Sequence, residues 1–212
     1  MPIPGKAVSV LPFILAIENP REIASDNFGP LVMPHPVTHT LIVYSTVDGH
    51  TLTICQRIRQ SLEGHGHRIT LISVEDALEL DCSRFDLIVI GASIRYGKHR
   101  PSLYDFIARH HAVLTCTPSA FFSVSAVARK AGKDTPAGNA YFRKFVRQAN
   151  WPPHLAATFA GKIEYSKYRF IDRQMIRFIM WMTNGPTALD AVVEFTDWNA
   201  VDAFALQING LR

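Results

Sequence analysis

Short apolar runs and helical patterns alternate along the chain after residue 38. Runs rich in β-branched and other apolar residues predict strands at 40–44, 68–74, 85–91, 119–124, 156–160 and 192–195. Apolar positions at helical spacing predict helices at 50–63, 75–80, 101–111, 141–150 and 197–208. The alternation of strand and helix predicts an α/β fold with a doubly wound parallel sheet. Such folds bind ligands beyond the carboxyl ends of their strands, so the loops that follow the strands are the first places to look for chemistry.

Residues 1–38 do not share this pattern. They contain seven of the thirteen prolines, and their one apolar stretch is broken by Pro12. A signal peptide has a longer uninterrupted apolar core and a small-residue cleavage site, and neither is clear here. We expect residues 1–38 to be a poorly ordered N-terminal extension and residues 39–212 to form the domain.

Cysteine usage and hydropathy exclude several classes of protein. Cys55, Cys82 and Cys116 form no CxxC pair, and their odd number argues against a disulfide scaffold or a zinc knuckle. No apolar run approaches the ~18 residues that a transmembrane helix needs. His65, His67, His110 and His111 have no carboxylate or cysteine at ligand spacing, so no metal site is expected.

The positive charge is concentrated in one part of the sequence. Eleven Lys/Arg and three Asp/Glu lie between Arg129 and Arg177, giving +8, whereas the rest of the chain has eleven and fifteen, giving −4. A basic segment on a mildly acidic domain indicates an anionic partner, which could be a lipid surface, a nucleic acid or an anionic substrate.

The loop after the first predicted strand, residues 45–51, is a candidate phosphate site. Its hydroxyl side chains and glycine open directly into a helix, whose N-terminal N–H groups and dipole attract anions. It matches neither GxGxxG nor GxxxxGK[ST], which argues against a dinucleotide site and a P-loop. The alternative is an ordinary N-cap followed by a turn glycine.

Two further loops, residues 91–97 and 123–129, follow the next two central strands. Both are rich in small residues that let a flat ligand approach the backbone, and Tyr96 offers a ring for stacking. Either loop alone could be an ordinary connection. Three such loops at one edge of the sheet favour a site for a flat, phosphorylated ligand.

These motifs resemble a known family. The strings Gly-Ala-Ser-Ile-Arg-Tyr-Gly at 91–97 and Ser-Val-Ser-Ala-Val-Ala-Arg-Lys at 123–130 are more diagnostic than the phosphate loop. With Thr135-Pro136, Tyr168–Arg173 and Phe195–Trp198, they resemble the bacterial menaquinone-dependent protoporphyrinogen oxidases, which have the flavodoxin fold. The resemblance spans about residues 39–210 and implies a five-stranded parallel sheet in the order 2-1-3-4-5.

The resemblance implies FMN as the cofactor, with its phosphate on the first loop and its ring system between the other two. The implied cofactor-binding residues are Ser45, Thr46, Val47, Asp48, Gly49, His50, Thr51, Ala92, Ser93, Ile94, Arg95, Tyr96, Gly97, Ser123, Val124, Ser125, Ala126, Val127, Ala128 and Arg129.

The implied reaction is the six-electron oxidation of protoporphyrinogen IX to protoporphyrin IX in haem biosynthesis, with a membrane quinone (menaquinone or ubiquinone) as acceptor. The redox chemistry belongs to the flavin, and no catalytic base is identified in the sequence. The substrate carries two propionates, and Arg95 and Arg129 are the candidate contacts, because guanidinium–carboxylate pairs orient planar ligands.

Residues 127–190 are expected to form a basic, partly helical insertion near the fifth strand. Within it, Arg169, Arg173 and Arg177 recur at helical spacing beside a wide apolar face over 168–182. Such a helix suits an anionic membrane surface, and a peripheral position on the cytoplasmic face of the bacterial inner membrane would bring a flavin to its quinone. The alternative is a helix packed against the core with solvated arginines.

Other functions remain open from the sequence. A flavodoxin-type electron carrier, or another FMN-dependent quinone reductase, would share the fold and the cofactor. The pI near 9.1 argues against a carrier, because carriers of this kind are typically acidic. A flavin-free nucleic-acid-binding module is not favoured, because no aromatic residues are set among basic ones on a sheet face.

Overall fold

The computed structural model describes residues 37–164 and 192–211. The strands are β1 (His39–Ser45), β2 (Arg68–Ser73), β3 (Leu87–Ser93), β4 (Ser119–Ser125), β5 (Leu155–Ala160), β6 (Lys162–Glu164) and β7 (Val192–Glu194). The helices are α1 (His50–Gly64), α2 (Pro101–Arg109), α3 (His111–Cys116), α4 (Ala140–Ala149) and α6 (Trp198–Asn209), with short 3₁₀ helices η1 (Cys82–Arg84) and η2 (Ala126–Arg129).

The main sheet has five strands in the order β2-β1-β3-β4-β5, all paired in parallel. This confirms the predicted α/β class and strand order. The order reverses between β1 and β3, so a crevice opens at the carboxyl ends of these strands. The predicted strand at 192–195 is also confirmed, but β7 pairs antiparallel with β6 outside the main sheet.

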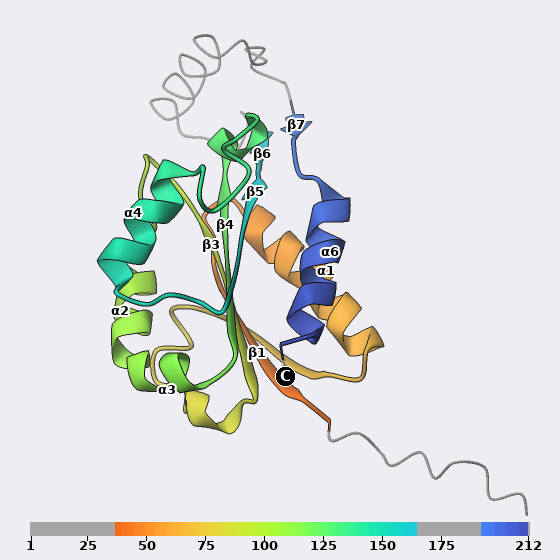
Figure 1. The fold of residues 1–212 in the computed structure, drawn as a ribbon, viewed down its shortest axis with the longest axis vertical. Helices are drawn as coiled ribbons and strands as arrows, with labels where there is room; N and C mark the ends of the chain where they lie inside the picture. The colour runs from red at the N-terminus through yellow and green to blue at the C-terminus, as the bar shows by residue number, and fades with distance from the viewer. Residues whose placement is uncertain (1–36, 165–191, 212) are drawn as a thin grey trace, which may run out of the picture. The chain divides into compact units, whose positions relative to one another are not determined.

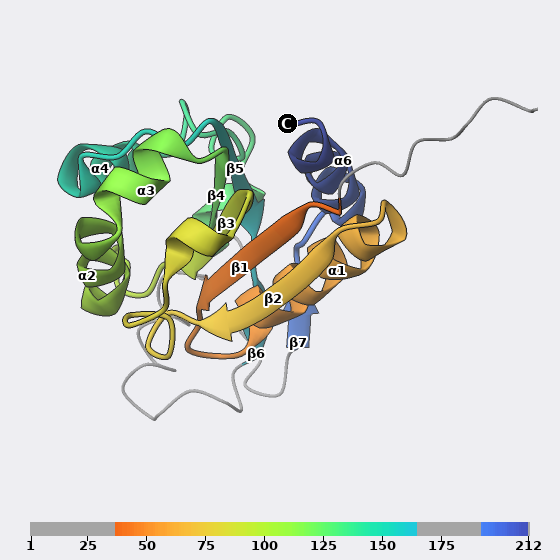
Figure 2. The ribbon, with the colours of Figure 1, turned by 90° about the horizontal axis from the view of Figure 1, so that it is seen from below.

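Helices cover both faces of the sheet (Figure 1), and the view from below shows the same three layers (Figure 2). On one face, α2, α3 and α4 bury Phe106, Leu114 and Phe145 against the sheet. On the other face, α1 and α6 bury Ile58 and Phe204. Each side chain of this size that is fully buried contributes about 1.5–3 kcal/mol.

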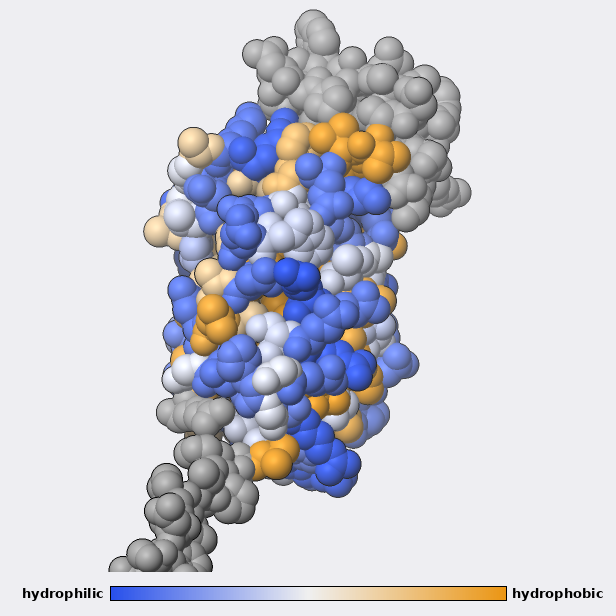
Figure 3. All heavy atoms as spheres, turned by 90° about the vertical axis from the view of Figure 1, so that its right-hand side faces the viewer, coloured by the Kyte–Doolittle hydropathy of each residue, from blue (hydrophilic) through white to orange (hydrophobic). Residues whose placement is uncertain are grey.

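Amphipathic helices account for this layering. The apolar positions of α1 and α6 recur at helical spacing and face the sheet. Their outer face carries mostly hydrophilic residues, as the surface view shows (Figure 3). β3 and β4 are buried along nearly their whole length, which explains their near-continuous apolar sequences.

One predicted helix is wrong. Residues 75–80 form a series of turns. The hydroxyl of Ser73 donates to Asp76 at 2.6 Å and accepts from the Asp76 N–H at 3.2 Å. Such local side-chain bonds compete with helical hydrogen bonding, and a six-residue segment has little cooperative gain to oppose them.

The predicted helix at 101–111 is interrupted. α2 ends at Arg109, and α3 begins after His110 and continues to Cys116, beyond the expected end. The ring nitrogen Nε2 of His110 lies 3.1 Å from the carbonyl of Leu78, which fixes the break.

Two predicted segments fall largely outside the described residues. The predicted amphipathic helix at 168–182 lies wholly outside them, as do residues 1–36. Within the expected insertion, 127–190, α4 and β5 are described, and they continue the strand–helix alternation of the main sheet.

Gly91 provides a test of the sheet packing. A Cβ at this position would lie 2.2 Å from Cζ of Phe122, because the ring of Phe122 lies over the Gly91 backbone. We expect Gly91→Ala to destabilise the protein by about 1–3 kcal/mol through overpacking. Urea unfolding measures the change.

Gly64 is the matched control for Gly91. It lies at the end of α1, and a Cβ there would meet no heavy atom within 4 Å. Gly64→Ala should leave stability unchanged or raise it by up to about 1 kcal/mol through helix propensity. Equal unfolding midpoints for the two variants would show that Phe122 does not restrict Gly91.

Candidate functional site

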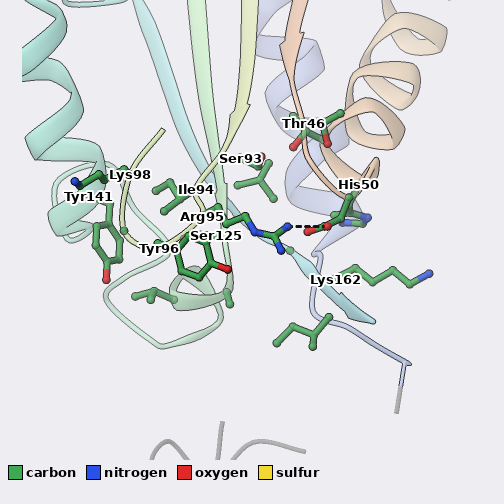
Figure 4. A pocket seen from close by; sticks show the side chains of 18 of the residues that line it. Thr46, His50, Ser93, Ile94, Arg95, Tyr96, Lys98, Ser125, Tyr141 and Lys162 are labelled. Carbon is green, nitrogen blue, oxygen red and sulfur yellow. Dashed lines mark hydrogen bonds and ion pairs between the residues drawn. The ribbon is translucent and has the colours of Figure 1, made fainter. Parts of the chain in front are cut away.

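A cavity of about 630 Å³ opens at the carboxyl edge of the main sheet. Its volume lies within the range of about 300–1,000 Å³ that is usual for small-molecule sites. The loops after β1, β3 and β4 meet around it, and the residues after β5 complete its wall. Figure 4 shows Thr46 and His50 on the side of α1 and Tyr141 and Lys98 on the side of α4.

The first loop, residues 45–51, leads directly into the N-terminus of α1. Gly49 is the N-cap residue with φ 86° and ψ −16°, a left-handed conformation that favours glycine, and it makes no side-chain cap. The hydroxyl of Thr46 accepts from the Gly49 N–H at 3.1 Å and holds the turn. The first turn of α1 contains no acidic residue, so its positive dipole end is not neutralised locally.

Buried hydroxyls in this region lack hydrogen-bond partners. Ser45 and Thr51 are each 1% exposed, and within the described residues neither hydroxyl has a hydrogen-bond partner. The hydroxyl of Ser125, which also lines the cavity, is buried and has no hydrogen-bond partner among the residues that the structure describes. A buried unpaired hydroxyl costs about 1–3 kcal/mol. Because Thr51 lines the cavity, a ligand oxygen could satisfy it.

His50 joins the first loop to the segment after β7. Thr196 donates its hydroxyl proton to the carbonyl of Ala160 at 2.9 Å, and its oxygen lies 2.6 Å from Nε2 of His50. Nε2 of His50 must therefore be the donor to Thr196. Burial lowers the pKa of His50, Glu194 opposes this effect, and Lys162 adds to it. His50 is thus a neutral positioning group at the cavity edge.

The second loop contains a tight hairpin. Arg95 and Lys98 exchange backbone hydrogen bonds of 2.9 and 3.1 Å, and Tyr96 and Gly97 form the turn with φ 52° and 72°. These angles match a type I′ turn, in which both central residues have positive φ. The turn presents the half-exposed ring of Tyr96 at the cavity edge, as Figure 4 shows.

An ion pair connects the first and second loops. Nη1 of Arg95 donates to the Asp48 carboxylate at 3.0 Å, drawn as a dashed line in Figure 4. The same guanidinium lies 5.6 Å from the centre of the Tyr96 ring. Arg95 therefore holds the two loops together at the cavity mouth.

His99 supports the second loop from beneath. It is 6% exposed, with Nδ1 3.3 Å from the carbonyl of Ser93 and Nε2 3.5 Å from the hydroxyl of Ser123. Burial lowers its pKa to about 4. Because a carbonyl only accepts, Nδ1 carries the proton of the neutral ring and Nε2 accepts from Ser123.

Only part of the third loop, residues 123–129, contributes to the cavity lining. Ser125, Ala126 and Val127 line the wall. Arg129 lies outside the lining, where its Nη1 donates to the carbonyl of Ala126 at 2.8 Å and its guanidinium lies 5.5 Å from the ring centre of Phe195. Arg129 therefore connects η2 to Phe195 and is not directed at the cavity lining.

The structure brings most of the sequence-predicted site residues into one cavity. Those that line it are Thr46, Asp48, His50, Thr51, Ser93, Ile94, Arg95, Tyr96, Gly97, Val124, Ser125, Ala126 and Val127. Those that belong to the three loops but do not line it are Ser45, Val47, Gly49, Ala92, Ser123, Ala128 and Arg129.

Sequence reasoning missed six residues of the lining. These are Lys98, Tyr141, Lys144, Gly161, Lys162 and Ile163. Gly161 follows the last strand of the sheet, so the rule that named the other loops could have found this one too. Tyr141 and Lys144 reach the cavity from α4, and no local pattern in the sequence indicates that position.

The cavity fits a ligand that has a phosphate at one end and a flat ring system in the middle. The α1 end offers a helix N-terminus and the hydroxyl of Thr51, which has no partner in the described part of the chain. The central walls offer the ring of Tyr96 and the small side chains of the third loop. These features occur together only because the loops converge at the reversal of strand order.

Known proteins show the same combination of fold and sequence. The chain matches the flavodoxin domain family over residues 41–190. A protoporphyrinogen IX dehydrogenase (quinone) of Leishmania major is 41% identical over 166 residues, which cover 78% of this chain and 72% of that protein. A protein of the same name from Escherichia coli (strain K12) is 41% identical over 169 residues, covering 80% of this chain and 93% of that protein.

A solved structure resembles the fold at lower sequence identity. The general stress protein 14 of Treponema denticola, in complex with FMN, is 14% identical with a TM-score of 0.45, covering 82% of this chain and 99% of that one.

Proposed function

The chain belongs to the flavodoxin domain family and, within it, to the quinone-dependent protoporphyrinogen IX dehydrogenases, and we propose that it oxidises protoporphyrinogen IX to protoporphyrin IX with FMN and a quinone acceptor. The proposal rests mainly on the groups found at the α1 end of the cavity. A helix N-terminus with a glycine cap meets a buried threonine hydroxyl that has no partner within the described residues. Phosphate oxygens would satisfy both the N–H groups and the hydroxyl.

Each of the three loops has a distinct part in holding FMN. Thr46 to Thr51 would bind the phosphate, Ser93 to Gly97 would lie along one side of the ring system, and Ser125 to Val127 would lie along the other. The Arg95–Asp48 ion pair and His99 keep the first two loops in position. A preformed site of this kind lowers the ordering cost of binding.

Bound FMN would supply the two-electron chemistry: it would accept electrons from the bridging carbons and pyrrole nitrogens of the macrocycle and pass them to a quinone. The complete reaction removes six electrons and six protons from protoporphyrinogen IX and converts three quinones to three quinols. The protein's own part is to bind and orient. The cavity wall carries the cations Arg95, Lys98, Lys144 and Lys162 against one carboxylate, Asp48, which favours an anionic substrate.

The proposal is tested by anaerobic turnover of the purified protein loaded with FMN. With protoporphyrinogen IX and either menaquinone or ubiquinone, we expect protoporphyrin fluorescence to appear, with quinone consumed three to one. Without quinone, each FMN can accept only two of the six electrons, so protoporphyrin should not exceed about one third of the flavin present. Formation of porphyrin at the rate of a heat-inactivated control would reject the proposal.

We also propose that the protein works at a membrane surface. Within the part of the chain that the structure describes, no helix is long and apolar enough to cross a membrane. The sequence of 168–182, which lies outside that part, combines Arg169, Arg173 and Arg177 with many apolar residues. A quinone dissolves in the bilayer, so attachment at the cytoplasmic face would bring it to the cavity.

Exchange of Arg169, Arg173 and Arg177 for glutamate is expected to release the protein from anionic vesicles. Each cation near an anionic surface contributes about 1 kcal/mol, so reversal of three charges should weaken binding by several orders of magnitude. Vesicle sedimentation measures the bound fraction. The matched control is Arg57, Arg59 and Arg68 changed to glutamate, three exposed cations on α1 and β2. Equal sedimentation of the two variants would show that 168–182 does not contact the membrane.

A further inference from the structure

We infer that Lys98 and Lys144 form the site that binds the propionate carboxylates of the substrate. The inference rests on the proposed function and names the end of the cavity at which the substrate's charged groups lie. It replaces the pair expected from the sequence, Arg95 and Arg129. Both of these guanidiniums already interact with other groups of the chain.

Arg95 and Arg129 are held by groups of the protein itself. Arg95 forms an ion pair with Asp48 at 3.0 Å, so its positive charge is already balanced by a carboxylate of the chain. Arg129 does not line the cavity and donates to the carbonyl of Ala126. Both side chains therefore position loops.

Contact between α4 and the hairpin brings the two lysines to one wall. A Cβ at Gly97 would lie 3.0 Å from Cε1 of Tyr141, so the tyrosine ring lies directly on the turn. Lys98 follows Gly97 in the hairpin. Lys144 lies three residues after Tyr141 on α4, a spacing that places both side chains on the same helix face. Both lysines line the cavity.

The charge at this wall has no partner within the chain as described. The carboxylate in the cavity lining, Asp48, is paired with Arg95. Within residues 37–164 and 192–211, no carboxylate forms an ion pair with Lys98 or Lys144. Two ammonium groups on one wall favour an anionic ligand group there.

The phosphate of FMN would not meet this charge. Figure 4 shows Thr46 and His50 at the α1 side of the cavity and Lys98 and Tyr141 at the α4 side, with Tyr96 between them. A flavin with its phosphate on α1 would leave the α4 wall to a second ligand. A tetrapyrrole with two carboxylates has the charge that the two lysines complement, whereas a quinone has none.

The test compares binding of protoporphyrin IX with binding of its dimethyl ester to the FMN-loaded protein. The ester has the same ring system but no negative charge. Porphyrin fluorescence anisotropy gives both dissociation constants, and KM for protoporphyrinogen IX gives a second readout. The variants are Lys98→Glu, Lys144→Glu and the conservative Lys144→Arg. Arg147→Glu is the matched control, because Arg147 is an exposed cation of α4 that does not line the cavity.

Each glutamate variant in the cavity is expected to weaken binding of the diacid about tenfold, which is the scale of one charge-assisted contact. Binding of the ester should change less than about twofold, Lys144→Arg should restore diacid binding, and Arg147→Glu should resemble the wild type. FMN content should remain unchanged in all of them.

Three outcomes would overturn the inference: wild-type protein that binds diacid and ester equally, cavity variants that weaken both equally, or an Arg147→Glu effect as large as that of Lys144→Glu. Failure of the proposed function is a different result, because wild-type protein would then not oxidise protoporphyrinogen IX at all.

Discussion

Replacement of Thr51 by valine is expected to stabilise the FMN-free protein and to weaken FMN binding. The hydroxyl of Thr51 is buried and has no partner within the described residues, so its burial is a cost that the folded protein bears. Valine has nearly the same shape and removes that cost. We expect the FMN-free protein to gain about 1 kcal/mol, which raises Tm by about 2–4 °C for a chain of this size.

The same change should raise the dissociation constant of FMN about tenfold to a hundredfold, because one charge-assisted hydrogen bond to phosphate is lost. A Gly49→Val exchange in addition should abolish stoichiometric binding, since Gly49 has φ 86°, a conformation that valine rarely adopts, and the change would distort the proposed phosphate loop. Calorimetric titration with FMN measures both effects, and titration with riboflavin isolates the part due to phosphate.

Thr53→Val is the matched control for Thr51→Val. Thr53 lies on the same helix, is exposed and does not line the cavity. It should leave FMN affinity unchanged. A Thr51→Val protein that loses stability and keeps its FMN affinity would show that Thr51 is an ordinary core residue.

The second large effect is a loss of stability in acid caused by His99. The pKa of His99 in the folded protein is about 4, lowered from 6.5 by burial. Between these two values the unfolded chain binds a proton that the folded protein does not. The contribution of neutral His99 to the free energy of unfolding is therefore fully present above pH 6.5 and is lost as the pH falls towards 4. The loss amounts to about 3 kcal/mol.

Urea unfolding at a series of pH values tests this prediction, with His99→Gln as the comparison. Glutamine can still donate to the carbonyl of Ser93, but it does not titrate. The variant should be less stable near neutral pH and should show a flatter pH profile between 6.5 and 4. Parallel profiles for the two proteins would place the acid sensitivity in other groups.

Local patterns in the sequence predict most of the sheet. The apolar runs of β3 and β4 and the amphipathic spacing of α1 depend on neighbours along the chain, so they are visible without the structure. The turns at 75–80 are not predicted, because the bond between Ser73 and Asp76 outweighs a weak helical pattern. The break at His110 depends on a contact with Leu78, thirty-two residues away.

The candidate site also has a part that the sequence predicts and a part that depends on contacts between distant segments. The three loops follow from the rule that parallel strands end at one edge, and that rule places thirteen of the predicted residues in the cavity lining. The α4 wall depends on the contact of Tyr141 with Gly97, which a sequence does not reveal. Arg129 is adjacent to the site in sequence, yet its interactions with Ala126 and Phe195 turn it elsewhere.

The most direct test of the proposed dehydrogenase activity is anaerobic mixing of the FMN-loaded protein with protoporphyrinogen IX, followed by addition of quinone. The absorbance of oxidised flavin should disappear on mixing, and it should return when quinone is added, while most of the porphyrin forms. An electron carrier would instead keep its flavin spectrum in the presence of protoporphyrinogen IX. If the flavin absorbance remains unchanged on mixing, in protein whose flavin a chemical reductant does bleach, the chain is not a protoporphyrinogen IX dehydrogenase.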